Sequence, residues 1–133
     1  MTHLLDTDTC IYWLKGSQPI LEHVKALGLN RIAVSVITVA ELYFGAHNST
    51  RVAENLARAE AFVRQISVRP LDDSTLKTFG RIKAELRKQG HPLADFDLLI
   101  ASTALAGGRV LVTNNVQHYK RIADLQLENW SAL

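Results

Sequence analysis

The feature that most constrains this chain is a short apolar run that stops at a carboxylate, Leu4-Leu5-Asp6-Thr7-Asp8-Thr9, close to the N-terminus. We interpret this run as a buried strand that delivers Asp6 to the carboxyl edge of a sheet. Open α/β sheets bind their ligands at that edge. The stretches Ser35–Glu41 and Asp95–Ile100 contain further carboxylates that we expect at the same edge. We therefore expect several acids to meet at one sheet edge and to hold a divalent metal ion there.

The remaining chain alternates short apolar runs with segments of helical spacing. Strands are expected over residues 3–5, 32–37, 67–71, 110–113 and 125–128, and helices over 7–14, 19–28, 38–45, 50–66, 73–89, 97–106 and 116–122. In the helix after Asp72, the residues expected to face inward are Leu76, Phe79, Ile82 and Leu86. This alternation predicts a single α/β domain over residues 1–133, a three-layer α/β/α sandwich with a central parallel sheet.

Composition limits the classes of protein that this chain can join. The 133 residues, 47% hydrophobic and 21% charged, are typical of one globular domain. No apolar run approaches the roughly 20 residues of a membrane span, and no secretory signal is recognised. Cys10 is the only cysteine, which excludes an intrachain disulfide and favours the cytoplasm. The net charge of +2 permits a nucleic-acid partner without indicating one.

Each carboxylate also has a purely structural interpretation. Asp6 can cap the helix that follows it. The run Thr38-Val39-Ala40-Glu41 matches a capping box, in which Thr38 is the N-cap and Glu41 bonds its backbone. Asp97 is favoured near a helix N-terminus, and Asp95 can cap that helix instead. Because all these acids are expected near the carboxyl ends of parallel strands, a shared site explains them together.

The expected metal is a hard divalent cation. Carboxylate oxygens suit Mg²⁺, whereas the scattered histidines and the lone cysteine do not form a zinc motif. Basic side chains around the site would have to offset the repulsion between the acids and a nucleic acid. The candidates lie on one expected helix and are Arg81, Lys83, Arg87 and Lys88, for which a solvated helix face is the alternative interpretation.

The opening motif resembles two families. Asp6-Thr7-Asp8-Thr9 resembles the Asp-x-Asp-x-Thr motif of haloacid-dehalogenase-type phosphatases, in which Asp6 would be the nucleophile and Asp8 an acid/base group. That resemblance leaves Glu41 without a role, offers no obvious motif lysine and asks for a larger domain. A binding module whose acids only cap helices is a third possibility.

The better match is the PIN domain, and within it the VapC toxins of type II toxin–antitoxin systems. Leu5-Asp6-Thr7-Asp8 resembles their opening motif, with Asp8 in place of the usual Asn. Ser35–Leu42 resembles the second motif and Gly90–Ala101 the third. Val112-Thr113-Asn114-Asn115 resembles the fourth, although many relatives have an acid where Asn115 stands. The resemblance spans essentially the whole chain.

The resemblance implies a metal-dependent endoribonuclease that inhibits translation, with transfer RNA as the first candidate among structured RNAs. Asp6, Glu41 and Asp97 would be the catalytic carboxylates and would bind Mg²⁺ or Mn²⁺, Glu41 directly or through water, and Asn115 would add a neutral oxygen. The residues expected to support these ligands or to contact phosphate are Thr7, Thr113 and Asp95. The implied partners are RNA, a second copy of the chain, and a VapB-like antitoxin, through which alone the protein would contact operator DNA.

Overall fold

The computed structural model describes residues 2–131 and contains one five-stranded parallel sheet. Its strands are β1 (His3–Leu5), β2 (Ile32–Ser35), β3 (Ser67–Arg69), β4 (Val110–Val112) and β5 (Leu127–Glu128). They are arranged in the order β3-β2-β1-β4-β5, and every neighbouring pair is parallel. The first strand of the chain is therefore the central strand of the sheet, as suits a strand that carries a site residue at its end.

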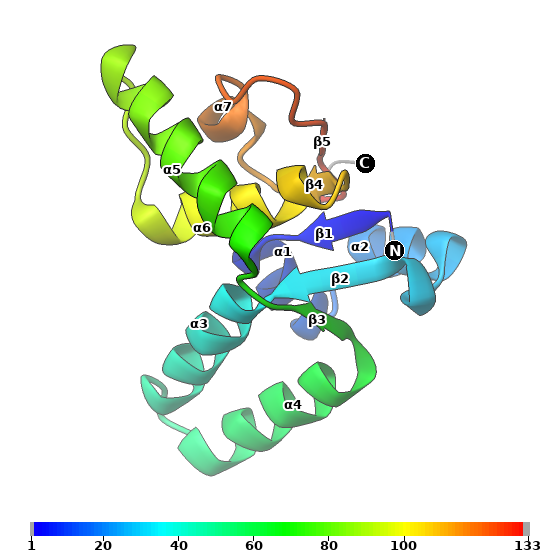
Figure 1. Cartoon of the computed structure of the whole chain (residues 1–133). Coiled ribbons are helices and arrows are strands. Elements are labelled where there is room, and N and C mark those ends of the chain that lie inside the picture. Colours follow the sequence, from blue (N-terminus) through cyan, green and yellow to red (C-terminus); the bar gives the residue numbers. More distant parts are fainter. Residues whose placement is uncertain (1, 132–133) are drawn as a thin grey trace.

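Seven helices and one short 3₁₀ turn, η1 (Leu29–Arg31), connect the strands within the described residues. The helices are α1 (Thr7–Leu14), α2 (Gln18–Leu27), α3 (Val36–His47), α4 (Val52–Gln65), α5 (Asp73–Lys88), α6 (Asp95–Ala106) and α7 (Val116–Tyr119). In Figure 1, α5 and α6 cover one face of the sheet, α1 and α2 lie behind it, and α3 and α4 form a hairpin. The expected three-layer α/β/α sandwich is confirmed.

The two faces of the sheet belong to two separate hydrophobic cores. Successive residues of a strand point to opposite faces, so Leu5 and Leu4 divide between them. Leu5 packs in one core with residues of α1, α2, α3 and α4, and Leu4 packs in the other with residues of α5, α6 and α7. Both leucines are fully buried. None of the helices within residues 2–131 combines the length and apolar character that a membrane crossing requires.

The strand expected over residues 32–37 is shorter than its sequence suggests. It ends at Ser35, whose hydroxyl accepts a hydrogen bond from the backbone N–H of Ile37 at 3.1 Å and caps α3. The expected N-cap at Thr38, and with it the capping box to Glu41, is therefore wrong. The neighbouring strands β1 and β3 have only three residues each, so the β-branched run after Ser35 has no partner to extend the ladder.

Of three smaller expectations at the ends of helices, two changed, and the cap of α5 at Asp72 is confirmed. Leu76 is 47% exposed, because Thr75 takes the inward position in the first turn of α5, four residues before Phe79. Asp72 caps α5 by accepting from the N–H of Thr75 at 2.9 Å. Asp95 is the first residue of α6 and makes no capping bond, since the N-cap position is held by an alanine.

The cap of α3 can be tested by removing one hydroxyl. We expect Ser35→Ala to lower the free energy of unfolding by about 1 kcal/mol, the usual effect of losing an N-cap. Urea denaturation measures this change. Ser17→Ala is the matched control, because Ser17 holds the N-cap position of α2 without a side-chain capping bond. Equal effects of the two substitutions would contradict the assignment of Ser35 as the functional cap.

Candidate active site

Four segments of the chain meet at the carboxyl edge of the sheet around one cavity of about 180 Å³. The first turn of α1 follows β1, the second turn of α3 follows β2, and α6 and the segment after β4 complete the wall. The carboxylate, threonine and asparagine residues that these segments contribute are Asp6, Thr7, Asp8, Glu41, Asp97 and Asn115. The structure thus brings together all four residues that the sequence analysis named as metal ligands.

Asp6 is the most buried of these acids, with 7% of its surface exposed. Its Oδ1 accepts from the backbone N–H of Thr9 at 2.9 Å, so Asp6 does cap α1 while also lining the cavity. Burial raises the pKa of the Asp6 carboxyl group, while contacts with Thr113 and Thr9 oppose that shift. The fully buried Thr113, expected to support a ligand, lies against this carboxyl group.

Glu41 is held by one hydroxyl group at the start of α1, which in turn contacts a second hydroxyl group on α3. The Thr7 hydroxyl donates to Oε1 of Glu41 at 2.6 Å, and the Thr7 and Thr38 hydroxyl oxygens are 3.1 Å apart. Thr38 is fully buried within α3. This chain of contacts joins the start of α1 to α3 and orients the Glu41 carboxylate, which is the kind of support expected of Thr7.

Two residues of the cavity wall were missed by the sequence analysis. His118 Nε2 lies 3.1 Å from Oδ2 of Asp97, and the His118 ring packs edge-on against the Tyr119 ring. Burial and the nearby carboxylates, led by Asp97, raise the pKa of the buried Tyr119. Both residues lie on α7, directly after the motif that contains Asn115. Since the segments that follow parallel strands meet at one sheet edge, α7 could have been expected to contribute to the site.

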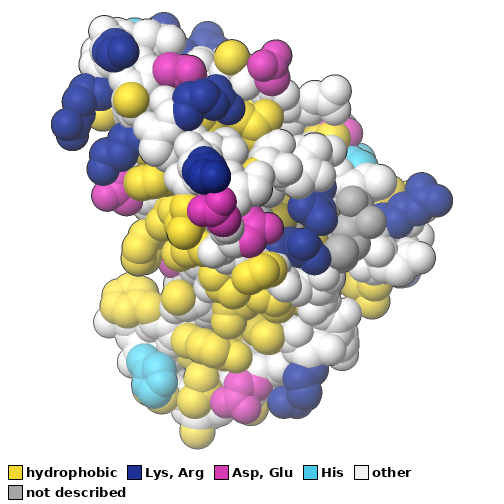
Figure 2. Space-filling view, viewed as in Figure 1, with side chains coloured by type: hydrophobic (Ala, Val, Ile, Leu, Met, Phe, Trp, Pro, Cys, Tyr) yellow, Lys and Arg dark blue, Asp and Glu magenta, His cyan; other side chains and the backbone are white. Residues whose placement is uncertain are grey.

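The remaining candidates lie outside the cavity. Asp95 forms an ion pair with Lys83 at 2.8 Å and, with Lys83 and Arg87, lines a separate depression. Arg81 pairs with Glu85 at 3.4 Å beside another depression, near the start of α5. Figure 2 shows Lys and Arg side chains gathered over α5, at the upper left of the view. The geometry therefore gives Asp95 no contact with the acid cluster.

The donor set fits a hydrated hard cation. Four carboxylates line the cavity, and no lysine or arginine is among the lining residues. In the part of the chain that is described, no three acidic, histidine or cysteine side chains already form a coordination shell. Mg²⁺ commonly binds only one or two carboxylates and keeps several waters. The cavity of about 180 Å³ leaves space for such an ion and some of its waters.

Comparison with known proteins places this architecture in a family. The model of the PIN domain matches residues 3–125. The tRNA(fMet)-specific endonuclease VapC of Shigella flexneri is 36% identical over 128 residues, which cover 96% of this chain and 97% of the relative. Ribonuclease VapC of Haemophilus influenzae is 38% identical over 132 residues, 98% of each chain. The chain therefore belongs to the PIN domain family and, within it, to the VapC ribonucleases.

Solved structures agree with this assignment. A chain in the crystal structure of DNA-bound VapBC from Salmonella typhimurium has a TM-score of 0.93 and 36% identity, with 98% of each chain covered. A chain of VapBC2 from Rickettsia felis, bound to a promoter DNA fragment, has a TM-score of 0.91 and 32% identity, with 98% of this chain and 99% of that chain covered. The haloacid-dehalogenase resemblance of the opening motif is thus a coincidence of four residues.

The buried state of Asp6 gives a test in metal-free protein. In EDTA at pH 7, we expect Asp6→Asn to raise the melting temperature by about 2–5 °C, because it removes a desolvated charge while Asn still caps α1. The folded pKa lies above the unfolded one, so the cost of ionisation grows as pH rises through the folded pKa. The rise in melting temperature should therefore disappear at about pH 3, where the carboxyl group is protonated in the folded and the unfolded state.

Asp72→Asn is the matched control for this test, because Asp72 makes the same 2.9 Å capping bond at an exposed position. Its bonds with Thr75 lower the Asp72 pKa, so the ionised carboxylate stabilises the fold above its unfolded pKa. We expect Asp72→Asn to lower the melting temperature at pH 7, with the loss fading as pH falls through the folded pKa. Changes of the same sign in both variants would contradict the assigned environment of Asp6.

Proposed function

We propose that this protein is a Mg²⁺- or Mn²⁺-dependent endoribonuclease that acts in the cytoplasm as a toxin and inhibits translation. The observation that supports it best is the cavity at the carboxyl edge of the sheet, which four carboxylates line without a lysine or arginine. Such a wall repels a phosphodiester unless a cation is bound, and its oxygen donors suit hard divalent ions. Membership of the VapC ribonucleases supplies the reaction class.

The residues divide into ligands and supports. Asp6 and Asp97 would bind the metal directly, Glu41 directly or through water, and Asn115 through its amide oxygen. A bound Mg²⁺ lowers the pKa of a coordinated water and stabilises negative charge on the phosphodiester. The protein fixes where that happens: the Thr7 hydroxyl holds Glu41. The backbone N–H of Thr9 likewise holds one oxygen of Asp6, which leaves the other oxygen for the cavity.

The proposed substrate is a transfer RNA, with the initiator as the first candidate. The support comes from relatives in Shigella flexneri and Salmonella typhimurium that are named tRNA(fMet)-specific endonucleases and are 36% and 35% identical to this chain. Each alignment covers 96% of this chain. Substrate choice depends on surfaces beyond the acid cluster, which recognises only a phosphodiester and its metal.

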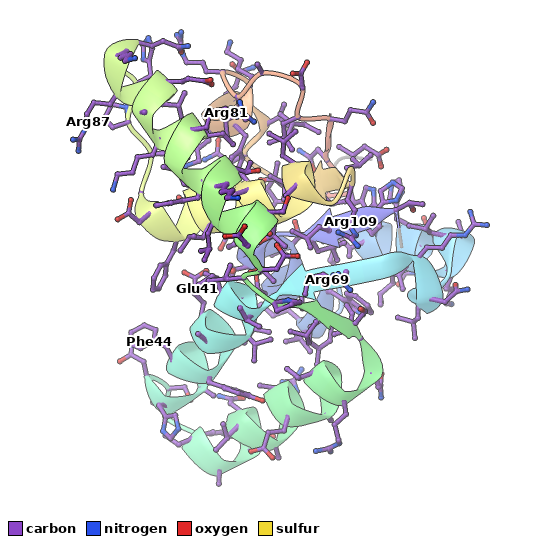
Figure 3. The ribbon with its side chains drawn as sticks, viewed as in Figure 1. Glu41, Phe44, Arg69, Arg81, Arg87 and Arg109 are labelled. Atoms are coloured by element: carbon purple, nitrogen blue, oxygen red, sulfur yellow. The ribbon has the colours of Figure 1, made fainter. Side chains whose placement is uncertain are left out.

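The proposed inhibitor is a VapB-like antitoxin, which would also provide the contact with operator DNA, and the toxin would form a homodimer. An apolar groove of about 230 Å³ runs between α1, α3 and α4 and shares Glu41 with the acidic cavity. Figure 3 shows Phe44, 68% exposed, projecting from α3. A segment bound in this groove would end beside the carboxylates and block them.

The nuclease proposal is tested with Glu41→Gln, which removes one charge and keeps an oxygen that can accept from Thr7. We expect transfer RNA cleavage with Mn²⁺ to fall by about 100-fold or more, while the free energy of unfolding without metal changes by less than about 1 kcal/mol. Glu85→Gln, on the exposed face of α5, is the control and should cleave normally. Both rates and denaturation curves are measured on purified protein.

Two outcomes would overturn the nuclease proposal. Normal cleavage by Glu41→Gln would favour a module whose acids serve only the fold. Phosphate recovered on Asp6 after incubation with a phosphate ester would show a phosphatase nucleophile instead.

The inhibitor groove is tested by filling it. Gly45 lines the groove on α3, and a Cβ at this position would meet no atom within 4 Å. We therefore expect Gly45→Leu to keep cleavage but to weaken inhibition by the antitoxin of the adjacent reading frame by about tenfold or more, since the side chain occupies the partner's space. Gly80→Leu on α5 is the control, because its Cβ also has open space. If the antitoxin inhibits Gly45→Leu as well as it inhibits the wild type, the antitoxin does not bind in this groove.

A further inference from the structure

Two further depressions adjoin the acidic cavity through shared lining residues, and we treat the three as one groove. His118 lines both the cavity and a neighbouring depression of about 190 Å³, whose wall also contains His91, Gln117 and Arg121. That depression shares Leu86, Pro92 and Leu93 with a further depression of about 310 Å³ that Lys83 and Arg87 border. The groove therefore runs from the carboxylates past α7 and then between the last turns of α5 and the loop before α6.

The charge of the wall changes along this groove. The cavity contributes four carboxylates, whereas the middle depression has Arg121 and His91 and no acid among its lining residues. The outer depression has Lys83 and Arg87, with Lys83 paired to Asp95 at 2.8 Å. Among residues 2–131, neither Arg87 nor Arg121 lies within salt-bridge distance of a carboxylate. These two guanidinium groups are available to an anionic ligand.

We propose that this groove, defined by His91, Gln117, His118, Arg121 and Arg87, holds the single RNA strand that flanks the scissile phosphodiester. The inference rests on the proposed nuclease function and adds the path of the substrate. A strand whose scissile phosphate lies in the acidic cavity needs cations for its next phosphates, and the groove supplies them on one side only. Arginine binds phosphate in this way through paired N–H groups.

The same geometry separates two arginines of one helix. Arg81 and Arg87 are six residues apart, which places them about 120° apart around α5. Figure 3 shows them leaving different sides of the helix. Arg81 pairs with Glu85, and the depression that it borders shares no lining residue with the cavity or the groove. Arg81 therefore lies off the proposed path, although it carries the same charge and lies on the same helix as Arg87.

An acidic segment of a protein partner is the competing occupant for two free arginines. RNA is the favoured occupant because the groove begins next to the proposed cleavage site and shares His118 with it. Histidine rings along the wall also offer flat surfaces to unstacked bases, as single-stranded RNA binding uses. The proposed site for the antitoxin is the apolar groove, which shares no lining residue with the two depressions beyond the cavity.

The test compares Arg87→Gln, Arg121→Gln and the double variant with Arg81→Gln as the matched control. Binding of a fluorescein-labelled single-stranded RNA is measured by anisotropy at several salt concentrations, in an Asp6→Asn background that does not cut the probe. We expect the double variant to raise Kd roughly tenfold and to lower the salt slope by about 1.4, because each single-strand phosphate contact contributes about 0.7. Arg81→Gln should match its parent in both quantities.

Cleavage of transfer RNA by the same variants with Asp6 intact supplies the second measurement. We expect Arg87→Gln and Arg121→Gln to raise KM several-fold at unchanged kcat, since neither residue touches the reacting atoms. Melting temperatures equal to wild type show that the exposed substitutions leave the fold intact. Weaker antitoxin binding with unchanged RNA affinity would assign the groove to a protein partner and overturn the proposal.

Failure of this inference is distinct from failure of the proposed function. If the wild-type protein cleaves RNA while the groove variants behave like Arg81→Gln, the proposed RNA path is wrong and the proposed nuclease function is still supported. If the wild-type protein cleaves no RNA and the labelled strand does not bind, both proposals fall.

Discussion

The structure depends on keeping a carboxylate buried at the end of its central strand. The backbone N–H of Asp6 donates to the carbonyl of Val112 on β4 at 3.0 Å, and its side chain accepts from Thr9 at 2.9 Å. Main chain and side chain are thus both fixed, between β4 and the first turn of α1. A charge in this position is unfavourable without compensation, and the folded protein accepts that cost because both cores hold β1 in place.

The acids of the cavity are positioned by hydroxyl groups and not by fixed cations. Thr7 contacts Glu41, and Thr113 lies against Asp6. A hydroxyl orients a carboxylate with one hydrogen bond and leaves its charge in place, whereas a lysine or arginine would neutralise it. The one imidazole in the wall, His118, contacts Asp97 from the side that opens to the groove. Negative charge therefore remains concentrated in the cavity, where it would attract a metal ion.

The sequence predicted the sheet and the convergence of the acids because both follow from short-range pattern and parallel topology. The strand ends near Asp6 and Thr113 were clear from their apolar runs. The cap of α3 was placed three residues too late, at Thr38, because the β-branched run after Ser35 is typical of a strand although the neighbouring strands are too short to pair with it. The contact of His118 with Asp97 joins residues 21 positions apart, so no local pattern could reveal it.

Glu41 belongs at once to the acidic cavity and to the apolar groove beside it. In the proposed complex, the residue that serves the reaction is also part of the surface that the inhibitor covers. Most residues of that surface take no part in the proposed chemistry, whereas Glu41 does. An inhibitor that recognises this carboxylate therefore contacts a residue that the toxin cannot replace without losing its own activity. That contact would persist even if other residues of the two partners changed.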